Sequence, residues 1–175
     1  MITAVIGLGN PGPQYRNTRH NIGRLICAAL VDRVAGPTAS WKSRFHGSWT
    51  HLQQPPVQLR VLIPDTYMNK AGESIRPFCD FFSLQPEQLL LVHDDLELPF
   101  GTVAHRRGGG LGGHNGLRSA EKHLGSRDFA RLRIGIGRPA RGDVSSWVLG
   151  RFSEQEEAEL EDIIEEAVQT ILSLQ

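Results

Sequence analysis

Apolar residues along this chain fall into two repeating patterns, one typical of strands and one typical of helices. Six short apolar runs have the composition of strands and span 2–8, 46–52, 57–63, 89–92, 102–106 and 132–136. Apolar residues recur at helical spacing in 21–34, in 68–82 despite Pro77, in about 115–124, and again after Ser153. Because strands and helices interleave, the pattern predicts an α/β fold built on a mixed sheet.

Several predicted elements carry recognisable start and stop signals. A glycine-proline pair at 36–37 closes the first helix, and the segment Gln-Gln-Pro-Pro joins 46–52 to 57–63 as an antiparallel pair. Ser153 and Glu156 have the spacing of a capping box that begins an amphipathic helix. We therefore expect a twisted mixed β-sheet flanked by helices, with an amphipathic helix at the C-terminal end.

The composition is that of an ordinary globular protein, with 39% hydrophobic and 22% charged residues and no internal repeat. The length suffices for one sizeable core, so we expect a single α/β domain spanning 1–175. No stretch approaches the roughly 20 apolar residues of a membrane span, and the N-terminus lacks the basic flank of a secretory signal. Cys27 and Cys79 are expected to be buried thiols rather than a disulfide. These features predict a cytoplasmic protein with no membrane partner.

The formal net charge of zero conceals a separation of charge along the chain. Residues 101–151 contain ten Lys or Arg against three Asp or Glu, whereas 152–175 contain eight Asp or Glu and no Lys or Arg. Such a basic segment can guide a polyanion to one face of the protein, although the composition alone equally allows a solvated surface. The acidic closing helix would repel phosphates, so we expect it to lie away from any nucleic-acid site.

The segment after the first strand has the layout of a reaction site. Asn10 and His20 both lie in the sequence GLGNPGPQYRNTRHNIG, which begins at Gly7. Pro11 and Pro13 keep this segment out of the helical conformation until about His20. The segment also matches the GxGxxG pattern of dinucleotide-binding folds, but the prolines block the helix that this pattern requires within its glycines. A nucleotide-cofactor enzyme is therefore the least favoured of the alternatives.

The other chemistry-bearing residues narrow the type of reaction. His93, Asp94 and Asp95 follow a predicted strand, but no two histidines have the spacing of a zinc-binding helix. The glycine-rich segment 108–113 is not a Walker A loop, and neither a GxSxG motif nor a base beside a cysteine supports covalent catalysis. General-base chemistry on water remains, for which His20 is the suitable residue and a carboxylate such as Asp94 could orient it.

The chain resembles the bacterial peptidyl-tRNA hydrolases, which cleave the ester joining a peptide to tRNA. Four blocks carry the resemblance, namely GLGNPGPQYRNTRHNIG from Gly7, PDTYMNKAGESI from Pro64, LLLVHDDLELPFG from Leu89, and RRGGGLGGHNGLRS from Arg106 continuing to RLRIGIGRP from Arg131. Their order and spacing cover most of the chain. The resemblance implies a monomeric enzyme whose partner is peptidyl-tRNA, with no metal, no other cofactor and no obligate protein partner.

The resemblance also assigns roles to individual residues. His20 would be the general base that activates water, and Asp94 would orient it and balance its charge. Asn10, Asn69 and Asn115 would line the peptide cleft, where a carboxamide both donates and accepts hydrogen bonds. One of these amides, or a backbone N–H near the glycine-rich segment, would stabilise the oxyanion that forms as water attacks.

Further residues would shape the cleft and bind the tRNA. The resemblance places Tyr67 and Met68 in the cleft wall, Tyr15 and His114 near it, and Arg106 and Arg133 on phosphates of the acceptor end. Members of the family often carry a second basic residue two positions before Arg106, where this chain has Ala104, and we expect Arg107 to compensate. Many members also continue with a basic tail beyond the position of Gln175, so we expect no tail contacts to tRNA.

Two other functions remain open from the sequence. A relative of the same fold could bind RNA without cleaving it, although such a protein would not require His20 and Asp94. The chain could also be a small-molecule or peptide hydrolase, in which case the basic segment would be only a solvated surface. The salt dependence of binding separates these alternatives, because neutralising phosphates makes binding weaken steeply with salt.

Overall fold

The strands join one sheet in the computed structural model, which describes all 175 residues. They are β1 (Ala4–Gly7), β2 (Lys42–Arg44), β3 (Gly47–Leu52), β4 (Leu59–Pro64), β5 (Leu89–Asp95), β6 (Val103–Arg107) and β7 (Ala130–Gly135). Their order across the seven-stranded sheet is β2-β3-β4-β1-β5-β7-β6. Neighbours from β4 through β1 and β5 to β7 are parallel, and the other pairs are antiparallel. The sheet is therefore mixed, as the sequence predicts.

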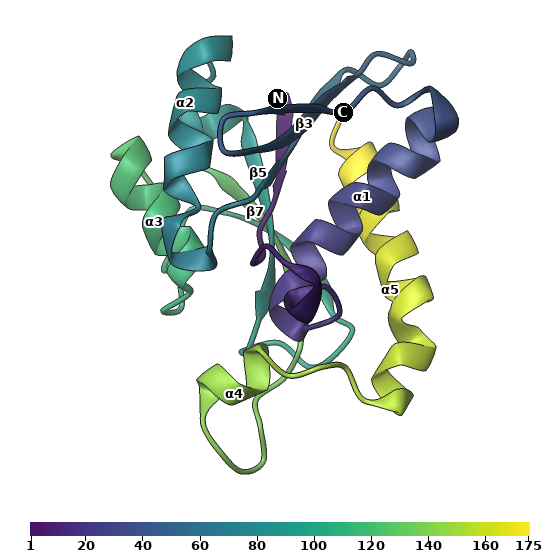
Figure 1. Cartoon of the computed structure of the whole chain (residues 1–175), viewed down its shortest axis with the longest axis vertical. Helices are drawn as coiled ribbons and strands as arrows, with labels where there is room; N and C mark the ends of the chain where they lie inside the picture. Colours follow the sequence, from purple (N-terminus) through teal and green to yellow (C-terminus); the bar gives the residue numbers. More distant parts are fainter.

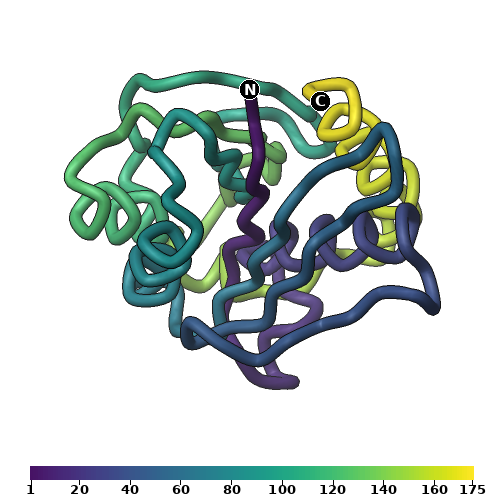
Figure 2. The backbone as a smooth tube through the Cα atoms, turned by 90° about the horizontal axis from the view of Figure 1, so that it is seen from above, coloured from purple at the N-terminus to yellow at the C-terminus, as the bar shows by residue number.

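Helices cover both faces of this sheet. They are α1 (Ile22–Ala35), α2 (Gly72–Phe82), α3 (Asn115–Leu124), α4 (Val144–Val148) and α5 (Glu154–Ser173). α1 and α5 pack together on one face, and α2 and α3 on the other, while the short α4 lies beyond one end of the sheet (Figure 1). The view from above separates the same two pairs of helices (Figure 2).

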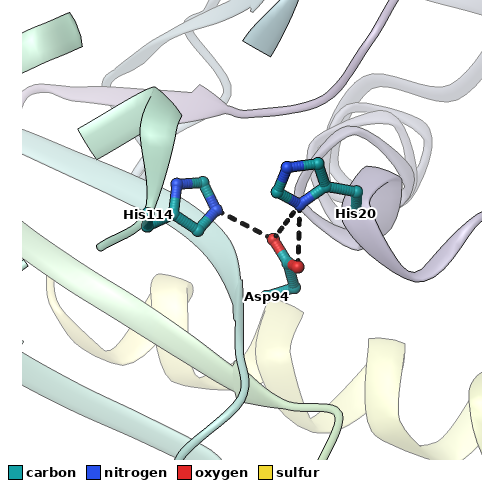
Figure 3. Close-up of side chains that lie close together, drawn as sticks. All are labelled: His20, Asp94 and His114. Carbon is teal, nitrogen blue, oxygen red and sulfur yellow. Dashed lines mark hydrogen bonds and ion pairs between the residues drawn. The ribbon is translucent and has the colours of Figure 1, made fainter. Parts of the chain in front are cut away.

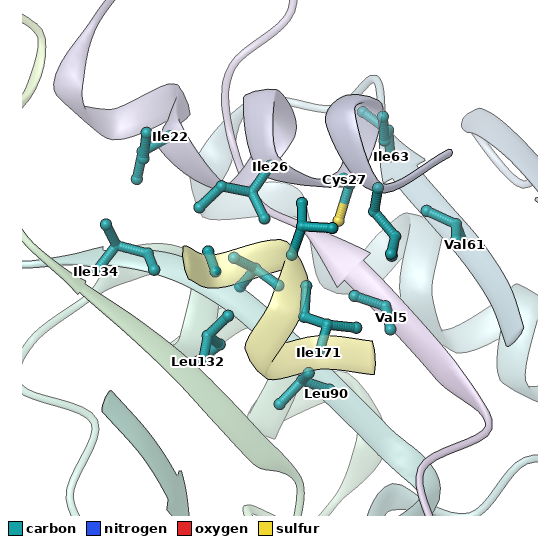
Figure 4. Close-up of a cluster of buried hydrophobic side chains, with 14 of the residues drawn as sticks. Val5, Ile22, Ile26, Cys27, Val61, Ile63, Leu90, Leu132, Ile134 and Ile171 are labelled. Carbon is teal, nitrogen blue, oxygen red and sulfur yellow. The ribbon is translucent and has the colours of Figure 1, made fainter. Parts of the chain in front are cut away.

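Alternation along the central strands builds a hydrophobic core on each face. Successive side chains of a strand point to opposite faces. Leu90 of β5 therefore meets Ile26 of α1 and Ile171 of α5 on one face (Figure 4), whereas Leu91 joins the core under α2 and α3. These four side chains are fully buried, and each burial stabilises the fold by roughly 1.5–3 kcal/mol.

Most predicted elements are confirmed. The helix predicted at 115–124 is α3, and the antiparallel pair at 46–52 and 57–63 is β3 with β4. The capping box of α5 forms in both directions, since the Glu156 N–H donates to Ser153 Oγ at 3.1 Å and the Ser153 N–H donates to Glu156 Oε1 at 2.9 Å. Pro77 lies inside α2 without ending it.

The structure corrects several boundaries and adds two elements. β5 continues through Asp95 instead of ending at residue 92, because β7 pairs with it as far as Gly135, and β7 itself begins two residues before the predicted 132–136. β2 was not predicted because its three residues are all exposed and carry no apolar alternation. α4 was not predicted because five residues are too few to show helical periodicity.

The two cysteines behave as the sequence predicts. Cys27 and Cys79 are free and buried, one in each hydrophobic core. Burial raises the pKa of each thiol to about 12, so neither is a nucleophile at neutral pH. Regarding membranes, none of the helices has both the length and the apolar character needed to span one.

The relative lengths of the parallel strands create a site at one end of the sheet. β1 ends at Gly7, which pairs with Val92, so β5 extends three residues further, through His93 to Asp95. The loop after β1 and the loop after β4 leave the sheet at this same end, because the three strands are parallel. Ligands of open α/β sheets bind outside the carboxyl ends of the strands, and this is where the predicted site residues lie.

Candidate active site

A cleft of about 750 Å³ opens at the carboxyl ends of β1 and β5. Ten of the predicted site residues line it: Asn10, His20, Tyr67, Met68, Asn69, Asp94, Arg106, His114, Asn115 and Arg133. Tyr15, the last residue of the 3₁₀ turn Pro13–Tyr15, does not line the cleft. No residue of α5 lines the cleft, as expected for the acidic helix.

The Asp94 carboxylate is the centre of the cleft's polar network. Its side chain is 2% exposed and accepts hydrogen bonds from two imidazole rings (Figure 3). His20 Nδ1 lies 2.9 and 2.8 Å from the two carboxylate oxygens, and His114 Nε2 lies 2.9 Å from Oδ1. Burial alone would raise the pKa of Asp94, but the two rings outweigh burial and hold this pKa below its usual range. Asp94 is therefore an ionised carboxylate that only accepts.

The tautomer of His114 follows from its position at the start of α3. His114 is the N-cap, and its Nδ1 accepts the backbone N–H groups of Gly116 and Leu117 at 3.1 and 3.3 Å. A backbone N–H can only donate, so Nδ1 carries no proton and Nε2–H donates to Asp94. His114 is thus a neutral ring that joins the helix to the carboxylate, a double role that its predicted place near the cleft did not include.

His20 is left with one free nitrogen. Because the ionised Asp94 only accepts, Nδ1 of His20 donates to it, and in the neutral ring the lone pair therefore lies on Nε2. Nε2 has no hydrogen-bond partner within the protein. The ring comes from the 3₁₀ turn Arg19–Asn21, all three residues of which are buried. His20 therefore presents a fixed proton acceptor at the cleft.

The turn that carries His20 is also joined to the wall formed by α4. The Arg19 guanidinium lies 3.6 Å from the Trp147 ring centroid, donates to the Trp147 carbonyl at 3.1 Å and forms a 2.7 Å ion pair with Glu156. Four residues of this segment line the cleft: Val144, Ser145, Val148 and Leu149. The sequence analysis missed this wall, although Asp143, which caps α4 through the Ser146 N–H, is a recognisable helix-start signal.

The three predicted asparagines differ in how much of their amide is free. Asn10 is 7% exposed, and its Oδ1 accepts the Met68 N–H at 2.7 Å, so only its NH₂ group is available to a ligand. Asn69 and Asn115 are exposed, and their side chains make no hydrogen bond within the protein. Asn10 thus offers a fixed donor, whereas the other two offer adaptable amides.

Three arginines form the basic wall of the cleft. Arg106 of β6 lies directly opposite Arg131 of β7, and Arg133 follows two residues later on the same face. Arg133 donates to Asp95 at 2.7 Å, whereas Arg106 and Arg131 have no carboxylate partner. Like charges placed directly opposite each other destabilise a strand pair. A bound anion would relieve this repulsion, so the arrangement is expected at an anion-binding site.

Arg131 was not among the predicted site residues. It is 3% exposed, its guanidinium donates to the Gly108 carbonyl at 2.8 Å, and its Nε has no partner. Burial, together with the neighbouring Arg106 and Arg133, lowers the pKa of Arg131. Arg131 lies one residue before the predicted strand 132–136, and only the observed start of β7 at Ala130 places it on the same face as Arg133.

The expected compensation by Arg107 is wrong. Successive residues of a strand point to opposite faces, and Arg107 donates to the carbonyls of Glu87 and Asp128 instead of lining the cleft. Ala104 lies directly opposite Arg133, on the face where the basic wall is formed. The third guanidinium of this wall is therefore that of Arg131.

The histidine cluster is arranged for hydrogen bonding. His20, Asp94 and His114 offer ligand atoms within 4.8 Å of one another, but both ring nitrogens nearest the carboxylate are its donors. His93 is 2% exposed and donates from Nδ1 to the Asp94 carbonyl at 2.8 Å. Burial, and then the neighbouring His114, lower the pKa of His93 to about 3, so this ring is neutral. The geometry fits an imidazole held by hydrogen bonds better than a metal centre.

Comparisons with known proteins point to one family. The profile described as peptidyl-tRNA hydrolase matches residues 4–175. The chain belongs to the peptidyl-tRNA hydrolase family. Peptidyl-tRNA hydrolases of Marinobacter nauticus and Wolinella succinogenes are 46% and 48% identical to it over 173 residues, covering 97% and 96% of this chain and 87% and 86% of theirs.

Solved structures of the family share this fold. The crystal structure of peptidyl-tRNA hydrolase from Acinetobacter baumannii superposes with a TM-score of 0.88 at 38% identity, covering 96% of this chain and 85% of that one. Family membership shows that this chain is an enzyme that hydrolyses peptidyl-tRNA, as the sequence predicts, and does not support the RNA-binding relative that the sequence left open. The predicted α/β fold with a mixed sheet and a C-terminal helix is confirmed, and the sheet has seven strands.

Proposed function

We propose that this chain hydrolyses the ester of peptidyl-tRNA with a water molecule activated by His20. The observation that carries the proposal is the fixed tautomer of His20, with Nδ1–H on the ionised Asp94 and the Nε2 lone pair at the cleft. A general base needs an unprotonated nitrogen within reach of water and a partner that stabilises its charged form. Both conditions are met by this pair of side chains.

The proposed reaction needs no covalent intermediate. Nε2 of His20 takes a proton as the water oxygen bonds to the ester carbonyl carbon, giving a tetrahedral intermediate. The bond from that carbon to the tRNA 3′ oxygen then breaks, and the imidazolium returns the proton to the leaving oxygen. The products are the peptide carboxylic acid and tRNA with a free hydroxyl. Asp94 stays ionised throughout and stabilises the imidazolium.

Asn10 is proposed to bind a carbonyl oxygen of the peptidyl group. Its Oδ1 is occupied by the Met68 N–H, so its NH₂ group donates toward the cleft. A donor that is already oriented stabilises negative charge on the attacked carbonyl without reorganisation. Asn69 and Asn115 would bind the peptide backbone or the 3′ nucleotide, with the exposed Tyr67 and the buried Met68 as the adjoining wall.

The basic wall is proposed to hold tRNA phosphates. Arg106, Arg131 and Arg133 present three guanidinium groups with Asp95 as their one carboxylate partner, which leaves an excess of positive charge. Contacts of this kind position a nucleic acid and supply affinity without reading its sequence.

Replacing Arg133 with alanine tests the basic wall. Arg133→Ala is expected to reduce the slope of log affinity for tRNA against log salt concentration by about 1, because one phosphate contact is lost. Asp95 would then face the cleft unpaired and repel phosphates further. The matched control is Arg107→Ala, which removes the same charge from the other face of β6 and should leave the slope unchanged.

A second arm of this test uses an ester without tRNA. Turnover of a short N-acyl amino acid ester should be unaffected by Arg133→Ala, since the substrate has no phosphate. Equal losses on both substrates, or equal changes in slope for the two arginine variants, would contradict the phosphate role.

Isotope labelling tests the proposed reaction. In H₂¹⁸O, hydrolysis of N-acetyl-aminoacyl-tRNA should place one ¹⁸O in the released carboxylate and none in the tRNA 3′ hydroxyl. Rapid acid quenching during turnover should trap no acylated protein. Label in the tRNA, or an acyl-protein adduct, would overturn the proposal of direct attack by water.

The domain organisation, oligomeric state, location and cofactor requirement of the enzyme are also proposed. We propose that the chain acts as one domain spanning 1–175, because a single sheet carries the strands around the cleft, and as a monomer. We also propose a cytoplasmic enzyme, which the two unpaired cysteines support. Activity without a metal or other cofactor is proposed from the mutual hydrogen bonding of His20, Asp94 and His114, and should persist in the presence of a chelator.

A further inference from the structure

Asn21 follows the proposed base His20 in the chain, and its side chain has no role in the proposed hydrolysis. It is 2% exposed and lies at the end of the 3₁₀ turn Arg19–Asn21. Its Oδ1 accepts the Asn10 backbone N–H at 2.8 Å, and its Nδ2 donates to the Asn10 carbonyl at 2.9 Å. One carboxamide therefore satisfies both backbone groups of Asn10, as a neighbouring strand would.

The position of Asn10 is fixed from a second side as well. Its Oδ1 accepts the Met68 N–H at 2.7 Å, so the residue is held by its backbone to one loop and by its side chain to another. Both sets of bonds are buried. These bonds restrict the orientation of the Asn10 NH₂ group, which therefore points toward the cleft with little freedom to rotate.

Gly9 makes the approach of Asn21 possible. A Cβ added at Gly9 would lie 2.9 Å from Asn21 Oδ1 and 2.4 Å from Arg24 Cδ, both closer than van der Waals contact. Only glycine leaves room for the Asn21 carboxamide beside the backbone of Asn10. The close packing indicates an arrangement that tolerates little displacement.

We propose that Asn21 is a positioning residue that acts through Asn10. Asn21 keeps the Asn10 NH₂ group aligned with the substrate carbonyl and joins it in one unit to His20, its neighbour in the chain. This inference rests on the proposed role of Asn10 as a donor to the substrate. A displacement of about 1 Å in such a donor lowers rates by roughly 100-fold in well-oriented sites.

A double-mutant cycle on kcat/KM for N-acetyl-aminoacyl-tRNA tests the proposal, using Asn10→Ala, Asn21→Ala and the double variant. Asn21→Ala alone should lower kcat/KM by roughly 10- to 100-fold. In the Asn10→Ala background the same change should cost less than about twofold, because the group through which Asn21 acts is gone. The backbone of Asn10, and hence any purely structural loss, is the same in both backgrounds.

A pH profile and a matched control complete the experiment. The midpoint of the acid limb should not move in Asn21→Ala, since the contacts between His20 and Asp94 are untouched. The control is Ser119→Ala, which loses a comparable buried bond to the Gly72 N–H at 2.9 Å but does not line the cleft. It should lower the melting temperature by a similar amount and leave kcat/KM nearly unchanged.

Three results would overturn the inference. Equal losses from Asn21→Ala in both backgrounds would mean that Asn21 supports the fold only. An effect of Asn10→Ala with none from Asn21→Ala would leave the proposed function intact and remove Asn21 from it. No effect from Asn10→Ala would contradict the role of Asn10 itself.

If Asn21→Ala does not fold, Asn21→Asp serves instead, because it keeps the acceptor for the Asn10 N–H and loses the donor.

Discussion

Replacing His20 with alanine is expected to lower kcat/KM for N-acetyl-aminoacyl-tRNA by roughly 10²- to 10⁴-fold, the usual contribution of a positioned general base. The variant loses the one nitrogen whose lone pair is held at the cleft, while Asp94 keeps its hydrogen bond from His114. Binding of uncharged tRNA should stay within about twofold of wild type, because the basic wall does not contact His20. Single-turnover hydrolysis and tRNA binding measured on the same preparation separate the two effects.

His105→Ala is the matched control for this variant. It also removes an imidazole, but from an exposed position on β6 that does not line the cleft. The control should hydrolyse the substrate at the wild-type rate. If His20→Ala retained activity within about threefold of wild type, the base would have to be another group.

The second large effect is expected from replacing Asp94 with asparagine. Asp94→Asn should lower kcat by roughly 10²- to 10⁴-fold, because a neutral amide cannot stabilise the imidazolium that forms on His20. The amide also has one acceptor oxygen where two N–H donors now converge, so its NH₂ group must face one of the rings. The His20 tautomer can then invert, which moves its proton to Nε2.

Nitrogen NMR of the histidine rings checks this prediction directly. In wild type at neutral pH the His20 proton should reside on Nδ1, and in Asp94→Asn a substantial fraction should move to Nε2. A variant that lost activity with the wild-type tautomer intact would point to charge stabilisation alone. Full activity in Asp94→Asn would contradict any role for the carboxylate.

The same substitution should change how stability depends on pH. The His20 and His114 rings outweigh burial and place the folded-state pKa of Asp94 below its usual range. Such a carboxyl stabilises the fold above its unfolded pKa, and the contribution is lost as pH falls through the folded value. The wild-type melting temperature should therefore fall more steeply on acidification than that of Asp94→Asn. Parallel profiles would show that the rings do not stabilise the ionised form.

Much of the fold could be predicted from local pattern alone. α3 and α5 have helical periodicity, α5 has a recognisable capping box, and β3 with β4 has the alternation and turn of an antiparallel pair. β2 and α4 have too few residues to produce a periodic signal. The end of β5 was misjudged because its polar residues resemble a loop, whereas the ladder with β7 extends the strand.

The candidate site was predictable as a set of residues but not as a network. Family resemblance brought His20 and Asp94 together across 74 positions, which periodicity cannot do. The tautomer of His114 depends on where the N-terminus of α3 packs, and the burial of Arg131 depends on the register of β6 against β7. The bonds of Asn21 to Asn10 depend on two loops meeting. These are tertiary contacts, for which the local sequence carries no signal.

The pH dependence of wild-type kcat/KM tests the central claim most directly. Between about pH 5 and 8, on N-acetyl-aminoacyl-tRNA, one ionisation should control the acid limb, and the rate should then fall about tenfold per pH unit. Asp94 remains ionised in this range because its pKa is lowered, so the limb reports protonation of the imidazole. A rate that stays flat down to about pH 5, with the protein still folded, would contradict His20 as the base.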